Sequence, residues 1–316
     1  TFDISNDSST QKVVVNFVDE DNSIVGEETF MNPANSEEFT IGYYLSKDLG
    51  TFDLDFGFRL DQIERSGSVS EEEHEDDHGD DHGDEHGDVD YYNIDDTTSS
   101  FAITLGRDLS DNLGISLGYA SVERLPSSIE LFMNGPHMAT GRFEVGDPNL
   151  NSETSNNFDI TFNFDNGDFY ALASFYITDV DNYIALIDEE DDHMDEDEHH
   201  EDEDEHHEGE DEHHEDEHDD HVHGNLIHAN YMQEDAEFDG YEIEFGRSFD
   251  LGSGELALSF GRDVVNAEFA DGHYVPRINP ARNIYSLVYT QDDLLFKLML
   301  KDCLLYTSPS PRDTVT

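Results

Sequence analysis

Two stretches of the chain consist almost entirely of carboxylates and imidazoles. Residues 188–223 read DEEDDHMDEDEHHEDEDEHHEGEDEHHEDEHDDHVH, and residues 71–90 read EEEHEDDHGDDHGDEHGDVD. Neutral imidazole nitrogen and carboxylate oxygen are ligands that suit zinc, nickel and copper(II). The two runs therefore predict binding of divalent metal ions, with Zn²⁺ first and Ni²⁺ or Cu²⁺ as the alternatives.

The histidines of the runs recur at regular intervals, every four residues in the first run and as pairs every seven residues in the second. On a helix either interval would align them, but carboxylates four residues apart repel one another, and Gly79, Gly83 and Gly87 disfavour a helix. We therefore expect both runs to be disordered without metal and to be neutralised by bound cations. The candidate ligands in this part of the chain are His74, His78, His82, His86, His193, His199, His200, His206, His207, His213, His214, His218, His221, His223 and His228.

A solvated acidic spacer is the alternative interpretation of the runs, but such a spacer does not need repeated histidine. Many weak, exchangeable sites would raise the local cation concentration, and the acidic field would speed the arrival of cations. The surrounding negative charge should raise the pKa of the imidazoles, so that protons compete and capture weakens as the pH falls.

The composition excludes several classes of protein. A formal net charge of −64 argues against nucleic acid as a partner and favours cations. The single cysteine, Cys303, provides neither a disulfide framework nor a thiolate metal site. No apolar stretch is long enough for a transmembrane helix, and no signal peptide is visible. Nothing resembles a nucleophile elbow or a phosphate loop, so we do not expect an enzyme.

Outside the runs, apolar and polar residues alternate from about residue 11 onward. Residues 51–60, TFDLDFGFRL, place three phenylalanines and two leucines on one face and polar residues or glycine on the other, and 158–164, 241–245 and 256–260 repeat the pattern. A period of two predicts about ten or eleven strands and little helix.

The connections between the predicted strands alternate between short and long. Short turns are expected near 46–51, 110–112, 165–168, 250–254 and 291–293, and long links near 19–36, 65–98, 123–152, 188–229 and 269–281. In an up-and-down meander every second connection lies at the same end. The pattern therefore predicts an all-β, antiparallel meander that forms part of a transmembrane β-barrel, with the long loops at one end. A soluble β-sandwich, whose strands also alternate, is the alternative.

Several pieces of the sequence resemble the barrel of TonB-dependent outer-membrane receptors. Within residues 121–165 the pieces are Arg124, Pro126, Glu130-Leu131, Gly146-Asp147-Pro148-Asn149-Leu150, Glu153 and Asn157. Further pieces are Phe238-Asp239-Gly240-Tyr241-Glu242, Val275-Pro276-Arg277-Ile278 and Pro280-Ala281-Arg282. The piece Asn134-Gly135-Pro136-His137-Met138-Ala139-Thr140, beside the His-rich runs, is similar to the zinc-uptake branch of the family.

The resemblance implies a protein of the bacterial outer membrane with its His-rich loops extracellular. Receptors of this kind have about 22 strands and a plug domain that meets a TonB-type energy-transducing complex. Residues 1–302 would then be a partial barrel in contact with outer-membrane lipid, and the plug, the TonB motif and further strands would lie outside this chain. Residues 303–316 resemble translated adapter sequence, and we expect them to be a non-native tail.

The resemblance also implies that His137, with Glu144 and Asp147 in the same link, binds metal at the barrel mouth after the runs capture it. The alternative is a loop histidine hydrogen-bonded to the backbone. Nearby arginines are expected to pair with acids. A siderophore or haem receptor of the same family, and a soluble secreted metal-buffering β-protein, remain alternative functions. The apolar strand faces distinguish a membrane barrel from a soluble protein, because a barrel exposes them to lipid and a soluble domain buries them under a second sheet.

Overall fold

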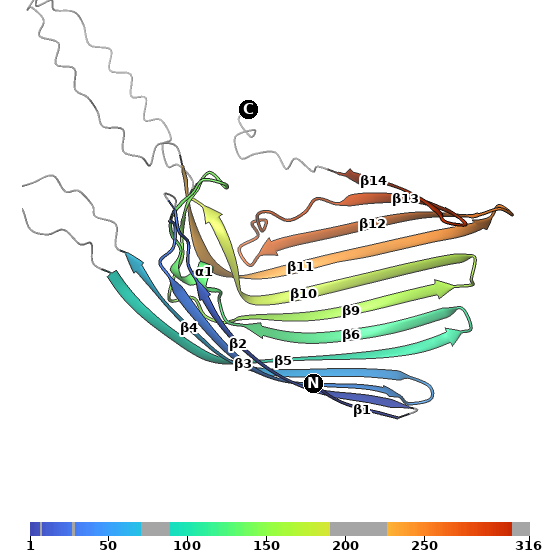
Figure 1. Cartoon of the computed structure of the whole chain (residues 1–316), viewed down its shortest axis with the longest axis horizontal. Coiled ribbons are helices and arrows are strands. Elements are labelled where there is room, and N and C mark those ends of the chain that lie inside the picture. The colour runs from blue at the N-terminus through green and yellow to red at the C-terminus, as the bar shows by residue number, and fades with distance from the viewer. Residues whose placement is uncertain (7, 27–28, 71–88, 190–225, 305–316) are drawn as a thin grey trace, which may run out of the picture.

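The computed structural model describes residues 1–6, 8–26, 29–70, 89–189 and 226–304. This part of the chain folds into one antiparallel sheet with a single short helix (Figure 1). The elements are β1 (Phe2–Asn6), β2 (Ser9–Asn22), β3 (Ala34–Asp48), β4 (Asp53–Ser70), β5 (Val89–Ser110), β6 (Leu113–Arg124), α1 (Ser128–Phe132), β7 (Asn134–His137), β8 (Arg142–Val145), β9 (Glu153–Asp165), β10 (Phe169–Asp188), β11 (Ile227–Asp250), β12 (Glu255–Phe269), β13 (Arg282–Gln291) and β14 (Leu294–Cys303).

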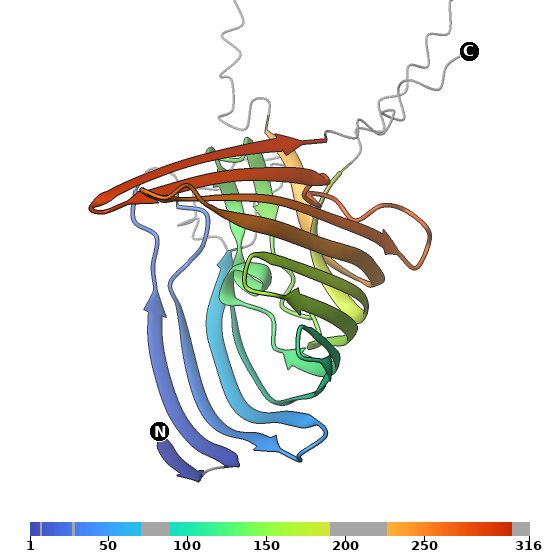
Figure 2. The ribbon, with the colours of Figure 1, turned by 90° about the vertical axis from the view of Figure 1, so that its right-hand side faces the viewer.

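Twelve of these strands pair in sequence order, and only β7 and β8 lie off this path. The sheet curves into an open C with β1 and β14 at its two edges (Figure 2). The predicted all-β antiparallel meander is confirmed. The number of strands on the path exceeds the expected ten or eleven; β1 lies before residue 11, where the sequence alternation begins.

Short and long connections alternate along the meander, as predicted, and the long links lie at one end of the sheet (Figure 1). Several strands run further than expected, however. Residues 65–70 belong to β4, residues 89–98 belong to β5, and His228 lies in β11 rather than in a loop. Backbone pairing continues through the mostly polar residues 65–70 to residues 89–98, which include the strand-favouring Val89, Tyr91, Tyr92 and Ile94.

One face of the sheet carries rows of apolar side chains that follow the strand register. Phe58 lies opposite Tyr43 on one neighbouring strand and Phe101 on the other, and Phe58 and Phe101 are each 42% exposed. Among the described residues, every strand belongs to this one sheet, so no second sheet covers the face. The exposed face excludes the alternative of a β-sandwich for this part of the chain and matches the lipid-facing surface of a membrane barrel.

The link between β6 and β9 folds into the hollow of the sheet and carries α1. Ser127 caps the helix in a reciprocal capping box with Glu130. Phe132 packs on Gly67 of β4, where a Cβ atom would lie 2.4 Å from the Phe132 ring. Leu131 and Phe132 anchor a small core at the loop end of the sheet. Among the described residues, no helix has the length and apolar character needed to cross a membrane.

Gly146→Ala should destabilise this folded link. A Cβ atom at Gly146 would lie 2.8 Å from the carbonyl carbon of Leu131 and 2.9 Å from the backbone nitrogen of Met133, and backbone atoms cannot move aside cheaply. We expect a loss of about 1–3 kcal/mol in the free energy of unfolding, measured by urea titration in detergent and by hydrogen exchange of 128–150. Gly57→Ala, which meets open space, is the control; equal behaviour of the two variants would contradict the packing argument.

Candidate metal-binding site at the loop end of the sheet

The hairpin of β7 and β8 lies beside the base of the second His-rich run. β8 pairs antiparallel with β7 and parallel with the first residues of β11, so that Arg142 lies opposite both His137 and Ile227. Because β11 begins directly after the second run, the fold places His137 close to the point where that run joins the sheet. The sequence alone held no sign of this parallel pairing.

His137 and Glu144 form a pair at this hairpin. The Nδ1 atom of His137 lies 3.1 Å from Oε1 of Glu144, and the hydroxyl of Thr140 donates to the same oxygen at 2.7 Å. Glu144 is 3% exposed, and the His137 ring stacks on Phe30 with centroids 4.8 Å apart. A carboxylate accepts hydrogen bonds, so the pair forms with the proton on Nδ1. That tautomer leaves Nε2 as the free lone pair of the imidazole.

Asp147, the third residue predicted for this site, lies in a turn. Its Oδ1 atom accepts hydrogen bonds from the backbone nitrogen of Asn149 at 2.8 Å and from the Asn149 side chain at 2.9 Å, so it stabilises the turn that follows β8. In the part of the chain that the structure describes, no three His, Cys, Asp or Glu side chains are grouped so that they could hold a metal ion. The structure therefore joins His137 to Glu144 but does not bring Asp147 to them.

Of the other predicted histidine ligands the structure describes His228, which does not join this pair. His228 stacks on Phe143 with ring centroids 5.1 Å apart. Neighbouring residues of a strand point to opposite faces, so this stack lies on the other side of β8 from Glu144. The remaining candidates lie outside the described residues; they are His74, His78, His82, His86, His193, His199, His200, His206, His207, His213, His214, His218, His221 and His223.

The arginines near the loop bases pair with acids, as expected. Arg142 donates to both oxygens of Asp188 at 2.7 and 2.8 Å, and Arg277 donates to Oδ1 of the same carboxylate at 2.9 Å. The remaining pairs are Arg124 with Glu130 and Glu153, and Arg282 with Asp263. Nothing in the sequence distinguished Asp188 from the acids of the run that follows it, so its bridging position emerges only from the structure.

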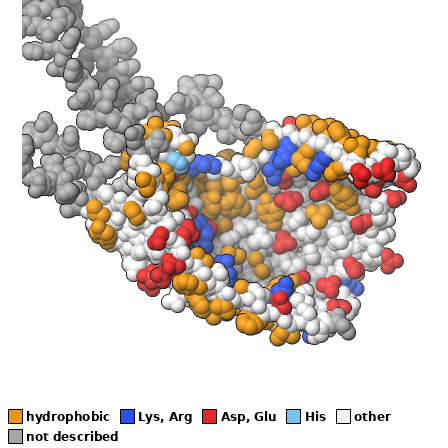
Figure 3. All heavy atoms as spheres, viewed as in Figure 1, with side chains coloured by type: hydrophobic (Ala, Val, Ile, Leu, Met, Phe, Trp, Pro, Cys, Tyr) orange, Lys and Arg blue, Asp and Glu red, His pale blue; other side chains and the backbone are white. Residues whose placement is uncertain are grey.

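A cleft of about 500 Å³ lies beside this bridge and is lined by Arg142, Asp188, Arg277, Asp271 and His273 together with apolar side chains. His273 lies 2.6 Å from Asp271, and hydrogen bonds from its backbone N–H and its ring lower the pKa of the Asp271 carboxyl. The concave face of the sheet is hollowed and carries charged side chains of both signs (Figure 3).

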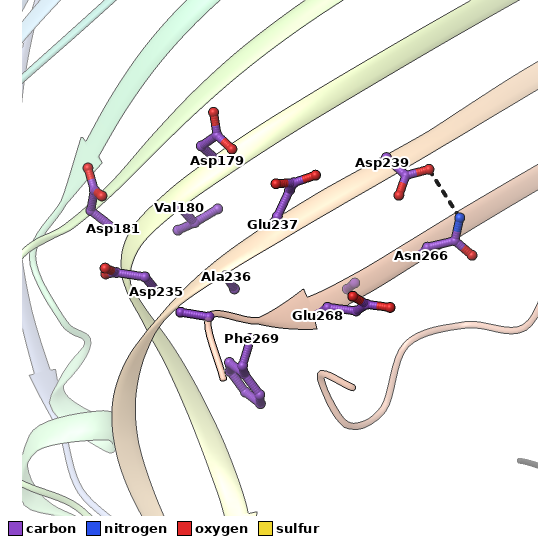
Figure 4. Close-up of a pocket in the computed structure, with 12 residues that line it drawn as sticks. Asp179, Val180, Asp181, Asp235, Ala236, Glu237, Asp239, Asn266, Glu268 and Phe269 are labelled. Carbon is purple, nitrogen blue, oxygen red and sulfur yellow. Dashed lines mark hydrogen bonds between the residues drawn. The ribbon is translucent and has the colours of Figure 1, made fainter. Parts of the chain in front are cut away.

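A second cavity, of about 490 Å³, is lined by carboxylates of β10, β11 and β12. Asp179 and Glu237 lie on one side of these strands and Phe269 on the other (Figure 4). Asp179 shares a face with Ile177, so the carboxylates continue the exposed apolar face towards the loop end. This cavity is therefore separate from the His137–Glu144 pair, which lies on the hairpin of the β6–β9 link.

A single meander with long links at one end, an exposed apolar face and a charged hollow defines a β-barrel membrane protein. The family model described as "TonB dependent receptor-like, beta-barrel" matches residues 7–299. The chain therefore belongs to this family of outer-membrane receptors and transporters.

Solved structures with the same fold include the copper transporter OprC, with a TM-score of 0.58 and 16% sequence identity over 85% of this chain. The Serratia marcescens hemophore receptor HasR, in complex with its hemophore HasA and heme, has a TM-score of 0.58 and 16% identity over 94% of this chain. The FrpB iron transporter from Neisseria meningitidis has a TM-score of 0.52 and 12% identity over 95% of this chain. The chain spans 34%, 48% and 40% of these three proteins, respectively. Identities this low establish the shared fold alone.

Proposed function

We propose that this chain is the barrel portion of a TonB-dependent receptor for a divalent metal, zinc first, which external His/Asp/Glu segments capture. The observation that carries the proposal is the His137–Glu144 pair at the base of the second His-rich run. A histidine whose Nδ1 is held by a buried carboxylate presents Nε2 in a fixed direction, which is the usual arrangement around a metal-ligating imidazole.

The strand ends from which the two runs continue support capture at the loop end. The first run follows β4 and the second follows β10, and both strands end at the end of the sheet where the long links lie (Figure 1). Exchangeable ligands in the runs would concentrate the ion, and His137 would receive it at the mouth. The same donor set also suits Cu²⁺ and Ni²⁺, which remain competing cargoes. The similarity to OprC, a copper transporter, adds weight to copper.

Membership of the family supports the remaining partners of the proposal. The exposed apolar face would contact outer-membrane lipid, and the His-rich runs would be extracellular. Import would need a plug domain and a TonB-type complex, because a receptor barrel does not itself supply energy. These partners belong to the whole receptor, of which this chain would form part of the barrel.

Equilibrium dialysis of the purified protein in detergent tests the proposal. At neutral pH we expect several Zn²⁺ ions per chain, bound in preference to Ca²⁺, because imidazole suits zinc and calcium takes oxygen ligands. Parallel dialysis against Cu²⁺ and Ni²⁺ ranks the cargoes. Equal retention of Ca²⁺ and Zn²⁺ would mean that carboxylates alone hold the cations, and the proposal would fail.

The cleft beside Asp188 favours a second candidate, a receptor for an anionic metal chelate or haem. Two guanidinium groups share one carboxylate there, next to apolar side chains such as Met232 and Tyr274. Haem titration followed by the Soret band tests this candidate. A saturable spectral shift that Arg277→Ala weakens would favour it over free metal.

A further inference from the structure

A continuous series of contacts joins the β12–β13 link to the His137–Glu144 pair. Arg142 binds Asp188 through two parallel hydrogen bonds and also donates to the carbonyl oxygen of Thr140 at 2.9 Å. The Thr140 hydroxyl in turn contacts both the carbonyl oxygen of His137 and the carboxylate of Glu144. Hydrogen bonds thus connect Asp188 to the His137–Glu144 pair through Arg142 and Thr140.

Arg277 reaches Asp188 from a different segment of the chain. It donates to Asp188 and to the carbonyl oxygen of Leu186, both on β10. Its φ of 64° places it in the left-handed region, which is uncommon for a residue with a side chain. Such a conformation persists where surrounding contacts over-determine it, and the two contacts to β10 supply that constraint.

We propose that Asp188 is a positioning residue for the His137–Glu144 pair, and that through it the 270–281 link is coupled to that pair. The planar fork of Arg142 holds both oxygens of the Asp188 carboxylate, and Arg277 adds one hydrogen bond to the same carboxylate and one to the carbonyl oxygen of Leu186, so the direction of each arginine is fixed. With Arg142 fixed, the turn that carries Thr140 is fixed, and the Nδ1 proton of His137 stays on the side of Glu144. The consequence for metal rests on the proposed function, whereas the consequence for the tautomer does not.

The test compares histidine ring ¹⁵N shifts in the metal-free protein in detergent. The His137 signal is assigned by its absence in His137→Asn. We expect the Nδ1–H tautomer in the wild type and a shift towards Nε2–H in Asp188→Ala, with recovery in Asp188→Glu. Arg277→Ala should shift the tautomer in the same direction by less. Arg282→Ala, which removes an ion pair outside this series, should leave it unchanged.

An unchanged His137 tautomer in Asp188→Ala would overturn the proposal. Circular dichroism and hydrogen exchange of β10 and β11 check that the variants fold; if Asp188→Ala does not fold, Arg142→Lys, which keeps the charge but loses the fork, replaces it under the same criterion. Zinc affinity, measured after the run histidines are changed to asparagine, should fall about tenfold in Asp188→Ala. A shifted tautomer with no zinc binding in any variant would support the positioning role and refute the proposed cargo.

Discussion

Changing the fourteen histidines at 74–86 and 193–223 to asparagine should reduce zinc binding from several ions per chain to about one. The substitution removes the imidazole nitrogens but leaves the formal charge at −64, because neutral histidine and asparagine carry no charge. Any loss of zinc is then attributable to imidazole ligation rather than to the acidic field. Isothermal titration at neutral pH measures both stoichiometry and affinity.

The pH dependence provides an independent check on the same residues. Protons and metal compete for the imidazole nitrogens, so zinc binding by the unmodified protein should weaken from about pH 7 towards about pH 5. The asparagine variant should lose the part of this dependence that the run histidines cause and keep only that of the one remaining site. If both proteins bind zinc equally well and with the same pH profile, the runs are acidic spacers and only the barrel assignment remains.

The second large effect is expected at the hairpin. In the background without run histidines, His137→Asn should abolish the remaining zinc site, and Glu144→Gln should weaken it by about 10- to 100-fold, since outer carboxylates orient metal-bound imidazoles. The Glu144→Gln variant would lose the charge that holds the Nδ1 proton, while Phe30 would still stack on the ring of His137. Titration calorimetry of the three proteins measures the difference.

His273→Asn is the matched control for the hairpin experiment. His273 is also paired with a carboxylate, at 2.6 Å, but its side chain is 83% exposed and lies in a different link. Its loss should leave the remaining zinc site unchanged. A result in which His273→Asn lowers the affinity as much as His137→Asn would place the site in the cleft beside Asp188 instead.

Much of the fold was predictable because alternation and connection length are local properties of the chain. A period of two identifies the strands, and the succession of short and long links places all the long links at one end of a meander. The boundaries were less predictable. Residues 65–70 and 89–98 were expected to form part of a long link, but residues 65–70 pair with 89–94 as strand. Residues 65–70 are mostly polar, whereas 89–98 include Val89, Tyr91, Tyr92 and Ile94, types that favour strands.

The sequence by itself determined the proposed donor set for metal and the presence of an apolar strand face, since both depend only on residue type and order, whereas the structure showed that this face is exposed in the described part of the chain. The tertiary structure decided which donors meet. It placed Glu144 in a buried contact with His137, placed Asp147 in a turn where it binds Asn149, and placed Asp188 between two arginines. Those outcomes depend on the parallel pairing of β8 with β11 and on links folding into the hollow of the sheet. Such contacts join residues far apart in the chain, and no local pattern encodes them.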